Sequence, residues 1–301
     1  INNNTMDVNQ DGIRAESGTS LTINNNIIND FEEHGINFHS SNNTTVNYNR
    51  IISTHNNGNW KVGIKNGNSN QNAIVNYNYI EISDPSSMPY NTKGNGIEVH
   101  DGQVIGDSII INTYSCSEEW GIYAPRSVIE DNYVKFFHQY DCNVSSAIIS
   151  WGDSSSRSTI QNNIIEANGF CKGIQSSYAD VLNNTMSHDF TGASNWCCYY
   201  QENDMYTIGW GSSNYIKGNN ITSFENGMYF DGYHNNIVDS NYIQVNRRGV
   251  YAPNANNLVV TNNTIQTNSG TIIHTTNGAS TVKYNLLTTG SGRGIHCENQ
   301  A

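Results

Sequence analysis

The stretch Ile23-Asn24-Asn25-Asn26-Ile27-Ile28 decides the fold, because its pattern returns along the whole chain. The pattern is Ile or Val, two further residues, Asn, one residue and then an apolar residue. The asparagines recur at a spacing of about 22 residues, which is the signature of a solenoid. They are Asn4, Asn26, Asn49, Asn78, Asn112, Asn132, Asn163, Asn184, Asn219, Asn241, Asn263 and Asn285. Tyr114, after Asn112, is the exception at the apolar position.

A short Gly-Ile element precedes each asparagine segment. The pairs are Gly12-Ile13, Gly35-Ile36, Gly63-Ile64, Gly96-Ile97, Gly121-Ile122, Gly173-Ile174, Gly227-Met228, Gly249-Val250 and Gly294-Ile295, with Ala147-Ile148, Thr207-Ile208 and Thr271-Ile272 in the other slots. Period-two alternation between Asn, Gly and Ser clusters predicts strands, and no helical period is sustained. A coil of about 22 residues holds three short strands, which predicts a parallel β-helix of about twelve coils.

The recurring asparagines have a structural explanation. Asn tolerates left-handed backbone at a tight bend and bonds to neighbouring main chain. When side-chain amides stack in register, each donates to one coil and accepts from the other. We therefore predict an internal asparagine ladder rather than a ligand site.

The repeats, of the type seen in Ile23–Ile28, resemble the right-handed parallel β-helix family. Its members include pectate-lyase-like enzymes, NosD-like periplasmic proteins and many archaeal surface proteins. The resemblance covers essentially the whole chain and implies an all-β, single-stranded, right-handed solenoid. It leaves function open, because this scaffold carries lyases, hydrolases, epimerases, tailspikes and inert surface proteins.

Composition narrows the remaining choices. A solenoid grows without splitting, so residues 1–301 are expected to form one domain. The formal net charge of −12 disfavours nucleic acid as a partner. No apolar run is long enough to span a membrane. No signal peptide stands at the start of the chain, which fits a mature exported protein. No cofactor is expected.

Four cysteines are spaced about one coil apart. Cys116, Cys142, Cys171 and Cys197 are separated by 26, 29 and 26 residues. Neighbouring coils lie about 4.8 Å apart, which suits disulfides. We expect Cys116–Cys142 and Cys171 with Cys197 or Cys198, and therefore an oxidising, extracellular setting. A zinc site is the alternative, but no C-x-x-C spacing supports it.

The sixth cysteine and two sequons carry further predictions. Cys297 falls at an inward position of its strand, where it is either a buried free thiol or a link to another chain. Asn43-Thr44-Thr45 and Asn143-Val144-Ser145 lie in expected loops. Asn43 and Asn143 are therefore candidate glycosylation sites, which would add covalent glycans as partners.

The outward row of the Gly-Ile strands holds the candidate catalytic residues. The row includes Lys65, Glu98, His100, Tyr123, Trp151, Gln175, Tyr229, Asp231 and Tyr251. Glu98, His100 and Tyr123 could gather on adjoining coils with Asp101 and Arg126. They would supply the base, acid and cation of a polysaccharide lyase, or the carboxylates of a hydrolase.

Two alternatives limit the catalytic interpretation. Mixed polar and aromatic residues cover any solenoid face. Tryptophans in the loops could instead stack on sugar rings without catalysis: Trp120, Trp151, Trp196 and Trp210. No metal site is expected, because the Gly-rich calcium-binding nonapeptide of other β-rolls is missing from the sequence.

The two ends suggest assembly. Ile1 begins in the middle of a coil, and Gln300-Ala301 follows a Gly-Ile strand, so both ends look uncapped. In a second copy joined head to tail, Asn4 would follow Asn285 by 20 residues, close to one repeat. The expected assembly residues are Ile1, Asn4, Met6, Asn285, Ile295 and Cys297. An open heterologous contact of this kind gives filaments.

The sequence therefore favours an extracellular structural subunit that stacks into a filament or sheath at a cell surface. A carbohydrate-active lyase or hydrolase is the first alternative. A non-catalytic glycan-binding module is the second.

Overall fold

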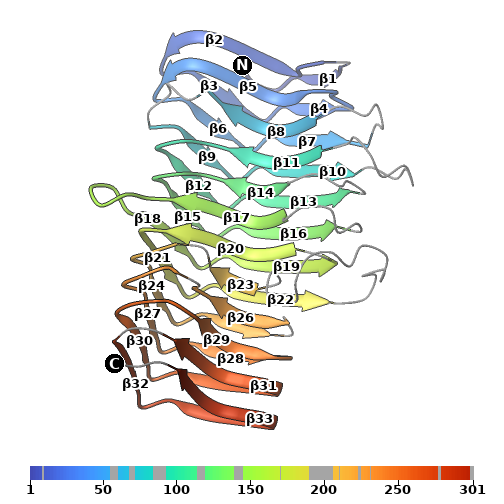
Figure 1. The fold of residues 1–301 in the computed structure, drawn as a ribbon. Coiled ribbons are helices and arrows are strands. Elements are labelled where there is room, and N and C mark those ends of the chain that lie inside the picture. Colours follow the sequence, from blue (N-terminus) through green and yellow to red (C-terminus); the bar gives the residue numbers. More distant parts are fainter. Residues whose placement is uncertain are drawn as a thin grey trace.

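The chain forms a parallel β-helix solenoid of about twelve coils (Figure 1). The structure is a computed structural model that describes residues 1–8, 10–54, 60–67, 72–83, 93–113, 119–138, 145–169, 171–189, 206–209, 211–222, 225–230, 232–276 and 279–298. Within these ranges every regular element is a β-strand, and no helix could cross a membrane. The N-terminal coil lies at one end of the solenoid and the C-terminal coil at the other.

Three strand positions recur in each coil and define three faces. Face 1 is a parallel sheet of 11 short strands. Its strands are β3 (Thr22–Asn24), β6 (Thr45–Asn47), β9 (Ile74–Asn76), β12 (Gln103–Ile105), β15 (Val128–Glu130), β18 (Ser158–Gln161), β21 (Ala179–Leu182), β24 (Tyr215–Lys217), β27 (Ile237–Asp239), β30 (Leu258–Thr261) and β32 (Ser280–Lys283).

Faces 2 and 3 form one sheet of 22 strands, because β31 (Thr264–Thr276) and β33 (Leu286–Glu298) run through both. Face 2 also contains β1 (Thr5–Asp7), β4 (Ile27–Asn29), β7 (Arg50–Ser53), β10 (Tyr79–Ser83), β13 (Ser108–Thr113), β16 (Tyr133–His138), β19 (Ile164–Gly169), β22 (Thr185–Asp189), β25 (Asn220–Thr222) and β28 (Tyr242–Val245). Face 3 also contains β2 (Ile13–Thr19), β5 (His34–Asn42), β8 (Trp60–Asn66), β11 (Lys93–Glu98), β14 (Trp120–Tyr123), β17 (Ser145–Trp151), β20 (Cys171–Ser177), β23 (Tyr206–Gly209), β26 (Asn226–Tyr229) and β29 (Arg248–Ala252).

The core is built from columns of apolar side chains that point inward from each face. On face 3, Ile36, Ile64, Ile97 and Ile122 stack in register and are fully buried. Each buried Ile stabilises the fold by about 1.5–3 kcal/mol relative to an exposed one. No coil encloses this surface alone, so stability comes from stacking.

The glycine of the Gly-Ile pair is required by close packing. A Cβ at Gly35 would lie 2.3 Å from Ile51 Cγ2 and 2.6 Å from the carbonyl oxygen of Gly63. A larger residue there would push the coils apart. One predicted pair needs correction: Val250 pairs with Ile273, so Ile272-Ile273 fills the slot that the sequence assigned to Thr271-Ile272. Two apolar residues follow each other there, and the local pattern could not distinguish them.

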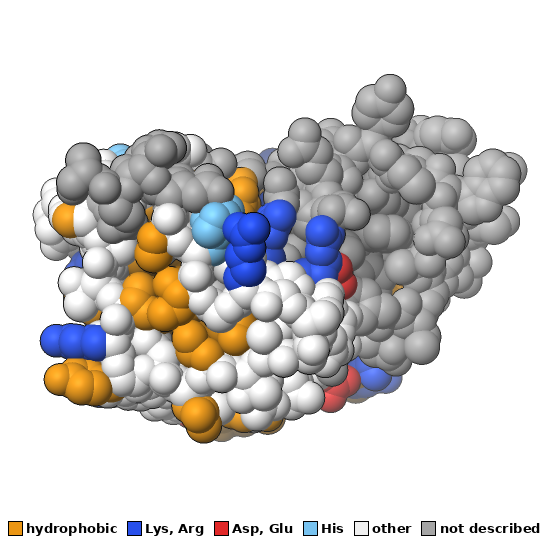
Figure 2. Space-filling model, turned by 60° about the horizontal axis from the view of Figure 1, so that its bottom comes forward, with side chains coloured by type: hydrophobic (Ala, Val, Ile, Leu, Met, Phe, Trp, Pro, Cys, Tyr) orange, Lys and Arg blue, Asp and Glu red, His pale blue; other side chains and the backbone are white. Residues whose placement is uncertain are grey.

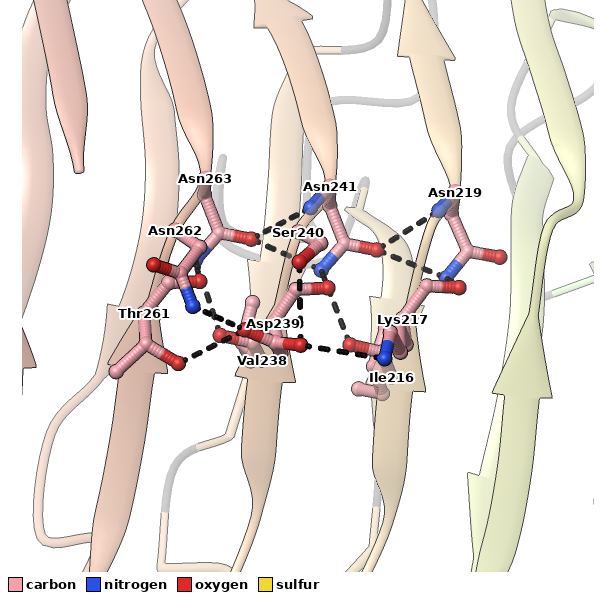
Figure 3. A network of polar contacts seen from close by, with 10 residues as sticks. All are labelled: Ile216, Lys217, Asn219, Val238, Asp239, Ser240, Asn241, Thr261, Asn262 and Asn263. Atoms are coloured by element: carbon pink, nitrogen blue, oxygen red, sulfur yellow. Dashed lines mark hydrogen bonds and ion pairs between the residues drawn. The ribbon is translucent and has the colours of Figure 1, made fainter. Parts of the chain in front are cut away.

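The asparagine ladder runs along the corner between face 1 and face 2. Figure 3 shows three of its members, in which Asn219 Nδ2 donates to Asn241 Oδ1 and Asn241 Nδ2 donates to Asn263 Oδ1, both at 2.9 Å. Each Oδ1 also accepts the backbone N–H of the preceding ladder residue, as in Asn219 N to Asn241 Oδ1 at 2.9 Å. The ladder therefore satisfies amides and main chain inside a buried corner.

Two details of the predicted ladder are corrected by the structure. Asn112 lies exposed on β13, and the ladder position of its coil is held by Asp107, which accepts from Asn78. The left-handed backbone is adopted by the residue before the ladder residue, as at Tyr48 (φ 54°) and Asn162 (φ 55°). The predicted bend is present, but the ladder asparagine itself is not the left-handed residue.

Candidate functional site

The candidate catalytic residues gather on the outer surface of face 3, over β8, β11 and β14. Parallel register places Lys65 beside Glu98 and Glu98 beside Tyr123, so the three side chains form one outward column across three coils. Lys65 Nζ lies 3.7 Å from Glu98 Oε2. The alternation expected from the sequence therefore places these residues together.

His100 lies in the turn after β11 and completes the group. Its Nε2 is 3.9 Å from Glu98 Oε1, and its ring centroid is 5.5 Å from that of Tyr123. The turn is held by Asn66, whose Oδ1 accepts the His100 backbone N–H at 3.0 Å. A group that can accept a proton and a group that can donate one thus lie next to each other and near one carboxylate.

Two tryptophans border this column. The ring centroids of Trp60 and Trp120 are 6.1 Å apart, and the Trp120 and Tyr123 centroids are 5.4 Å apart. Lys65 Nζ lies 5.6 Å from the centroid of Trp60. Trp60 is half exposed, so its ring offers a surface on which a sugar could stack. We call Trp60, Lys65, Glu98, His100, Trp120 and Tyr123 the charged–aromatic cluster.

The electrostatics of the cluster keep a proton on Tyr123. Burial raises the pKa of Tyr123, the nearby carboxylate of Glu98 raises it further, and Arg126 lowers it. The phenol is therefore a hydrogen-bond donor at neutral pH. Arg126, the predicted cation, makes two hydrogen bonds to Asp101, with Nε–Oδ1 at 2.6 Å and Nη2–Oδ2 at 2.7 Å. These bonds raise the pKa of Arg126 and leave Lys65 as the cation within the column.

A groove of about 310 Å³ opens beside the cluster. It is lined by Glu33, His34, Trp60, Val62 and Lys65. Trp60 and Lys65 of the cluster therefore border this groove. Two of the lining residues, Glu33 and His34, lie close to Asp11, and the sequence had singled out none of the three.

The arrangement combines a base, an acid and a cation within a few ångströms. His100 could accept a proton, Tyr123 could donate one, and Lys65 could bind an anionic substituent. A glycosidase would need two carboxyl groups facing one bond. Glu98 is available for that role, but Asp101 is engaged with Arg126. The geometry therefore suits proton abstraction better than hydrolysis.

Most cysteine predictions lie outside the described residues. Cys116, Cys142, Cys197 and Cys198 belong to segments that the structure does not describe, as does the side chain of Cys171. The disulfides stay predictions. Cys297 is exposed on β33, with its Sγ 3.6 Å from Thr275 Oγ1. It is exposed because β33 forms the last described coil.

Of the two glycosylation candidates, one lies within the described residues and one lies outside them. Asn43 is exposed at a turn before β6, and Asn72 Nδ2 donates to its Oδ1 at 3.3 Å. Asn143 lies outside the described residues. Glycosylation at either site stays a prediction.

The predicted assembly residues lie at the two ends of the solenoid. Ile1 and Ile295 are about half exposed, and Asn4, the first ladder residue, donates to Asn26. At the other end the ladder finishes at Asn285, which accepts from Asn263. Figure 2 shows apolar side chains gathered on the C-terminal end of the solenoid.

Comparisons with known proteins agree with the architecture. A family described as "Right handed beta helix region" matches residues 194–301. PfbA, a surface adhesin of Streptococcus pneumoniae, is similar in structure, with a TM-score of 0.51 and 15% identity over 97% of this chain and 85% of that chain.

Two further solved structures are similar more loosely. The periplasmic alginate epimerase AlgG gives a TM-score of 0.41 at 11% identity, over 90% of this chain and 76% of its own. The Dettilon tailspike protein gives 0.48 at 9% identity, over 95% and 61%. A search of curated proteins finds no match. At 15% identity the likeness to PfbA shows the β-helix fold and not its chemistry.

Proposed function

We propose that this right-handed β-helix repeat protein binds uronate-containing polysaccharides on face 3 and cleaves them by elimination. The observation that supports this is the column Lys65–Glu98–Tyr123 with His100 beside it. Aromatic rings next to a cation and a proton-transfer pair are what an anionic sugar chain needs for binding and chemistry.

Each residue has a defined role in this proposal. Lys65 pairs with the uronate carboxylate and lowers the cost of removing the adjacent C–H proton. His100 accepts that proton. Tyr123 donates its phenolic proton to the leaving glycosidic oxygen. Glu98 orients Lys65 and His100 through contacts of 3.7 and 3.9 Å, and Trp60 and Trp120 bind the sugar faces.

A cell-surface or exported location accompanies this function, because such polymers lie outside the cytoplasm. The adhesin and periplasmic epimerase among the similar structures are in keeping with it. The disulfides expected among the cysteines would fit the same setting.

The test is incubation of the protein with a panel of uronate polymers. We expect ultraviolet absorbance from unsaturated uronates, and its loss in Tyr123→Phe and Lys65→Ala. Tyr79→Phe is the matched control, because Tyr79 lies on face 2, bonds to a carboxylate at 2.7 Å and also has a raised pKa. Binding without turnover would indicate a glycan-binding module instead. The absence of both binding and turnover would refute the proposal.

End-to-end stacking into a filament is a second proposal. It is supported by the unchanged parallel register from one coil to the next, as in the eleven partner pairs between β31 and β33. A second copy could continue that register by main-chain hydrogen bonds. Negative-stain images should then show fibres with an axial repeat of roughly 58 Å, from twelve coils at about 4.8 Å each. A sample that stays monomeric at high concentration would refute it.

A further inference from the structure

We propose that Asp11, Glu33 and His34 bind a divalent transition-metal ion where the first two coils of face 3 meet. Asp11 lies just before β2, Glu33 lies just before β5, and His34 is the first residue of β5. One ligand atom from each lies within 4.8 Å of the other two. The backbone fixes this approach, since Gly12 N–H donates to the His34 carbonyl oxygen at 2.9 Å.

The spacing of the atoms suits a small ion. His34 Nδ1 and Asp11 Oδ1 are 2.7 Å apart, and both side chains are largely buried. In a tetrahedral site with bonds of about 2.0–2.2 Å, ligand atoms lie roughly 3.3 Å apart. A small rotation of each side chain would therefore admit an ion between them. Glu33 is exposed and would close the site from the solvent side.

Asn37 provides an independent indication of a ligand. Its side chain is only 4% exposed, and its Oδ1 has no hydrogen-bond partner among the described residues. Its Nδ2 lies 3.5 Å from Asp11 Oδ2 and 3.4 Å from His34 Nδ1. His34 Nδ1 cannot donate to Asp11 and accept from Asn37 at once. Turning the amide would place Oδ1 beside the Asp11 carboxylate, and a cation between these two acceptors would bind both.

The ligand set indicates the class of metal. One imidazole with carboxylate and amide oxygens favours zinc, cobalt or nickel over calcium or magnesium, which prefer oxygen alone. Arg14 Nη1 is the nearest competing cation, 3.8 Å from Asp11 Oδ2, but its Nη2 is closer to Glu16, at 2.6 Å. Glu33 and His34 also line the groove with Lys65, so further coordination positions would open there.

The experiment is a titration of the metal-free protein with cobalt(II). Cysteines are alkylated first, because Cys297 is an exposed thiol that could bind the probe. We expect one equivalent to bind with visible absorption typical of nitrogen and oxygen ligands, and the melting temperature to rise. The variants are His34→Ala and His34→Gln. The matched control is His39→Ala, which removes a histidine from the same strand, outside the proposed site.

The outcomes are distinct from those of the carbohydrate test, on which this inference does not depend. The site is supported if both His34 variants lose the one equivalent of bound cobalt(II) and His39→Ala keeps it. Circular dichroism checks that each variant keeps its β-structure. Unchanged binding in the His34 variants, or no saturable binding by the unmodified sequence, overturns the proposal.

Discussion

The replacement of one ladder asparagine by Asp107 should make the free energy of unfolding of the solenoid depend on pH. Asp107 Oδ1 accepts from Asn78 N at 2.7 Å and from Asn78 Nδ2 at 2.9 Å, as a ladder amide would. Its second oxygen is buried without a hydrogen-bond partner among the described residues. At Asn132, the corresponding Nδ2 donates to Val104 O and Asn163 Oδ1. An ionised Asp107 therefore presents an acceptor where the ladder needs a donor.

Protonation repairs this mismatch. Burial raises the pKa of Asp107 from 3.8 to about 7, against the opposing effect of the two bonds from Asn78. Because the folded state binds the proton more tightly than the unfolded chain, the free energy of unfolding falls as pH rises from about 4 to about 7. The rise in pKa corresponds to at most about 4 kcal/mol. Below this range the carboxylic acid donates and the contribution is fully present.

The perturbation is Asp107→Asn, which restores the amide. At about pH 8 the variant should be more stable than the parent by about 1–3 kcal/mol, and the difference should shrink toward zero at about pH 4. Chemical unfolding across this range measures it. Asp239→Asn is the control with the opposite sign, because hydrogen bonds from Asn262, Thr261 and Ser240 lower the pKa of Asp239. A parent whose stability rises steadily from about pH 5 to about pH 8, with no gain in Asp107→Asn, would refute the reasoning.

Three further predictions concern the ladder, the core and the cysteines. Asn163→Leu and Asn241→Leu should each lower the free energy of unfolding by roughly 1–3 kcal/mol, since each removes an acceptor of two hydrogen bonds. The control Asn112→Leu, at an exposed position, should change it by less than about 0.5 kcal/mol. Equal thermal unfolding of all three variants would contradict the ladder. Gly35→Ala should destabilise the folded protein by about 1–3 kcal/mol through overpacking. Gly18→Ala should not destabilise it, because the new Cβ would meet only Ser41 Oγ at 3.7 Å. Thermal unfolding followed by circular dichroism compares the two variants. Peptide mapping without reduction should find at least two disulfides among Cys116, Cys142, Cys171, Cys197 and Cys198, and free thiols throughout would remove that prediction.

The repeat pattern predicted the fold because the apolar residues recur in the sequence with the same period as the coils that bury them. Away from the two ends, an Ile or Val three residues before a ladder position is the buried centre of a face 1 strand, as at Ile23 and Val46. The prediction failed at Asn112, where the sequence Val104-Ile105-Gly106-Asp107-Ser108-Ile109 carries the same pattern with a carboxylate. Searching for Asn alone missed it. An isosteric Asp fits the same backbone, and only its burial distinguishes it from a surface carboxylate.

The candidate site was predicted only in part. Alternation along a strand placed Glu98 and Tyr123 outward, and the coil period placed them side by side. The sequence could not show that Arg126 would be engaged by Asp101. It also missed Asp11 and His34, because their contact depends on the lateral register of two coils and on turn geometry rather than on a repeated residue.

Regularity along a column distinguishes the stacked structural positions from the proposed site in this solenoid. Every column repeats at the coil spacing, so like residues stabilise it by stacking on themselves. Tyr229 with Tyr251, and His274 with His296, show this, since their ring centroids are 5.5 and 4.7 Å apart toward the C-terminal end of the outward column of face 3. Near the N-terminal end the same column changes to Lys65, Glu98 and Tyr123. Unlike neighbours gain little from stacking, and these three residues are the ones that we propose to act together across three coils. The change of residue type along this column therefore marks the surface where we expect catalysis or binding.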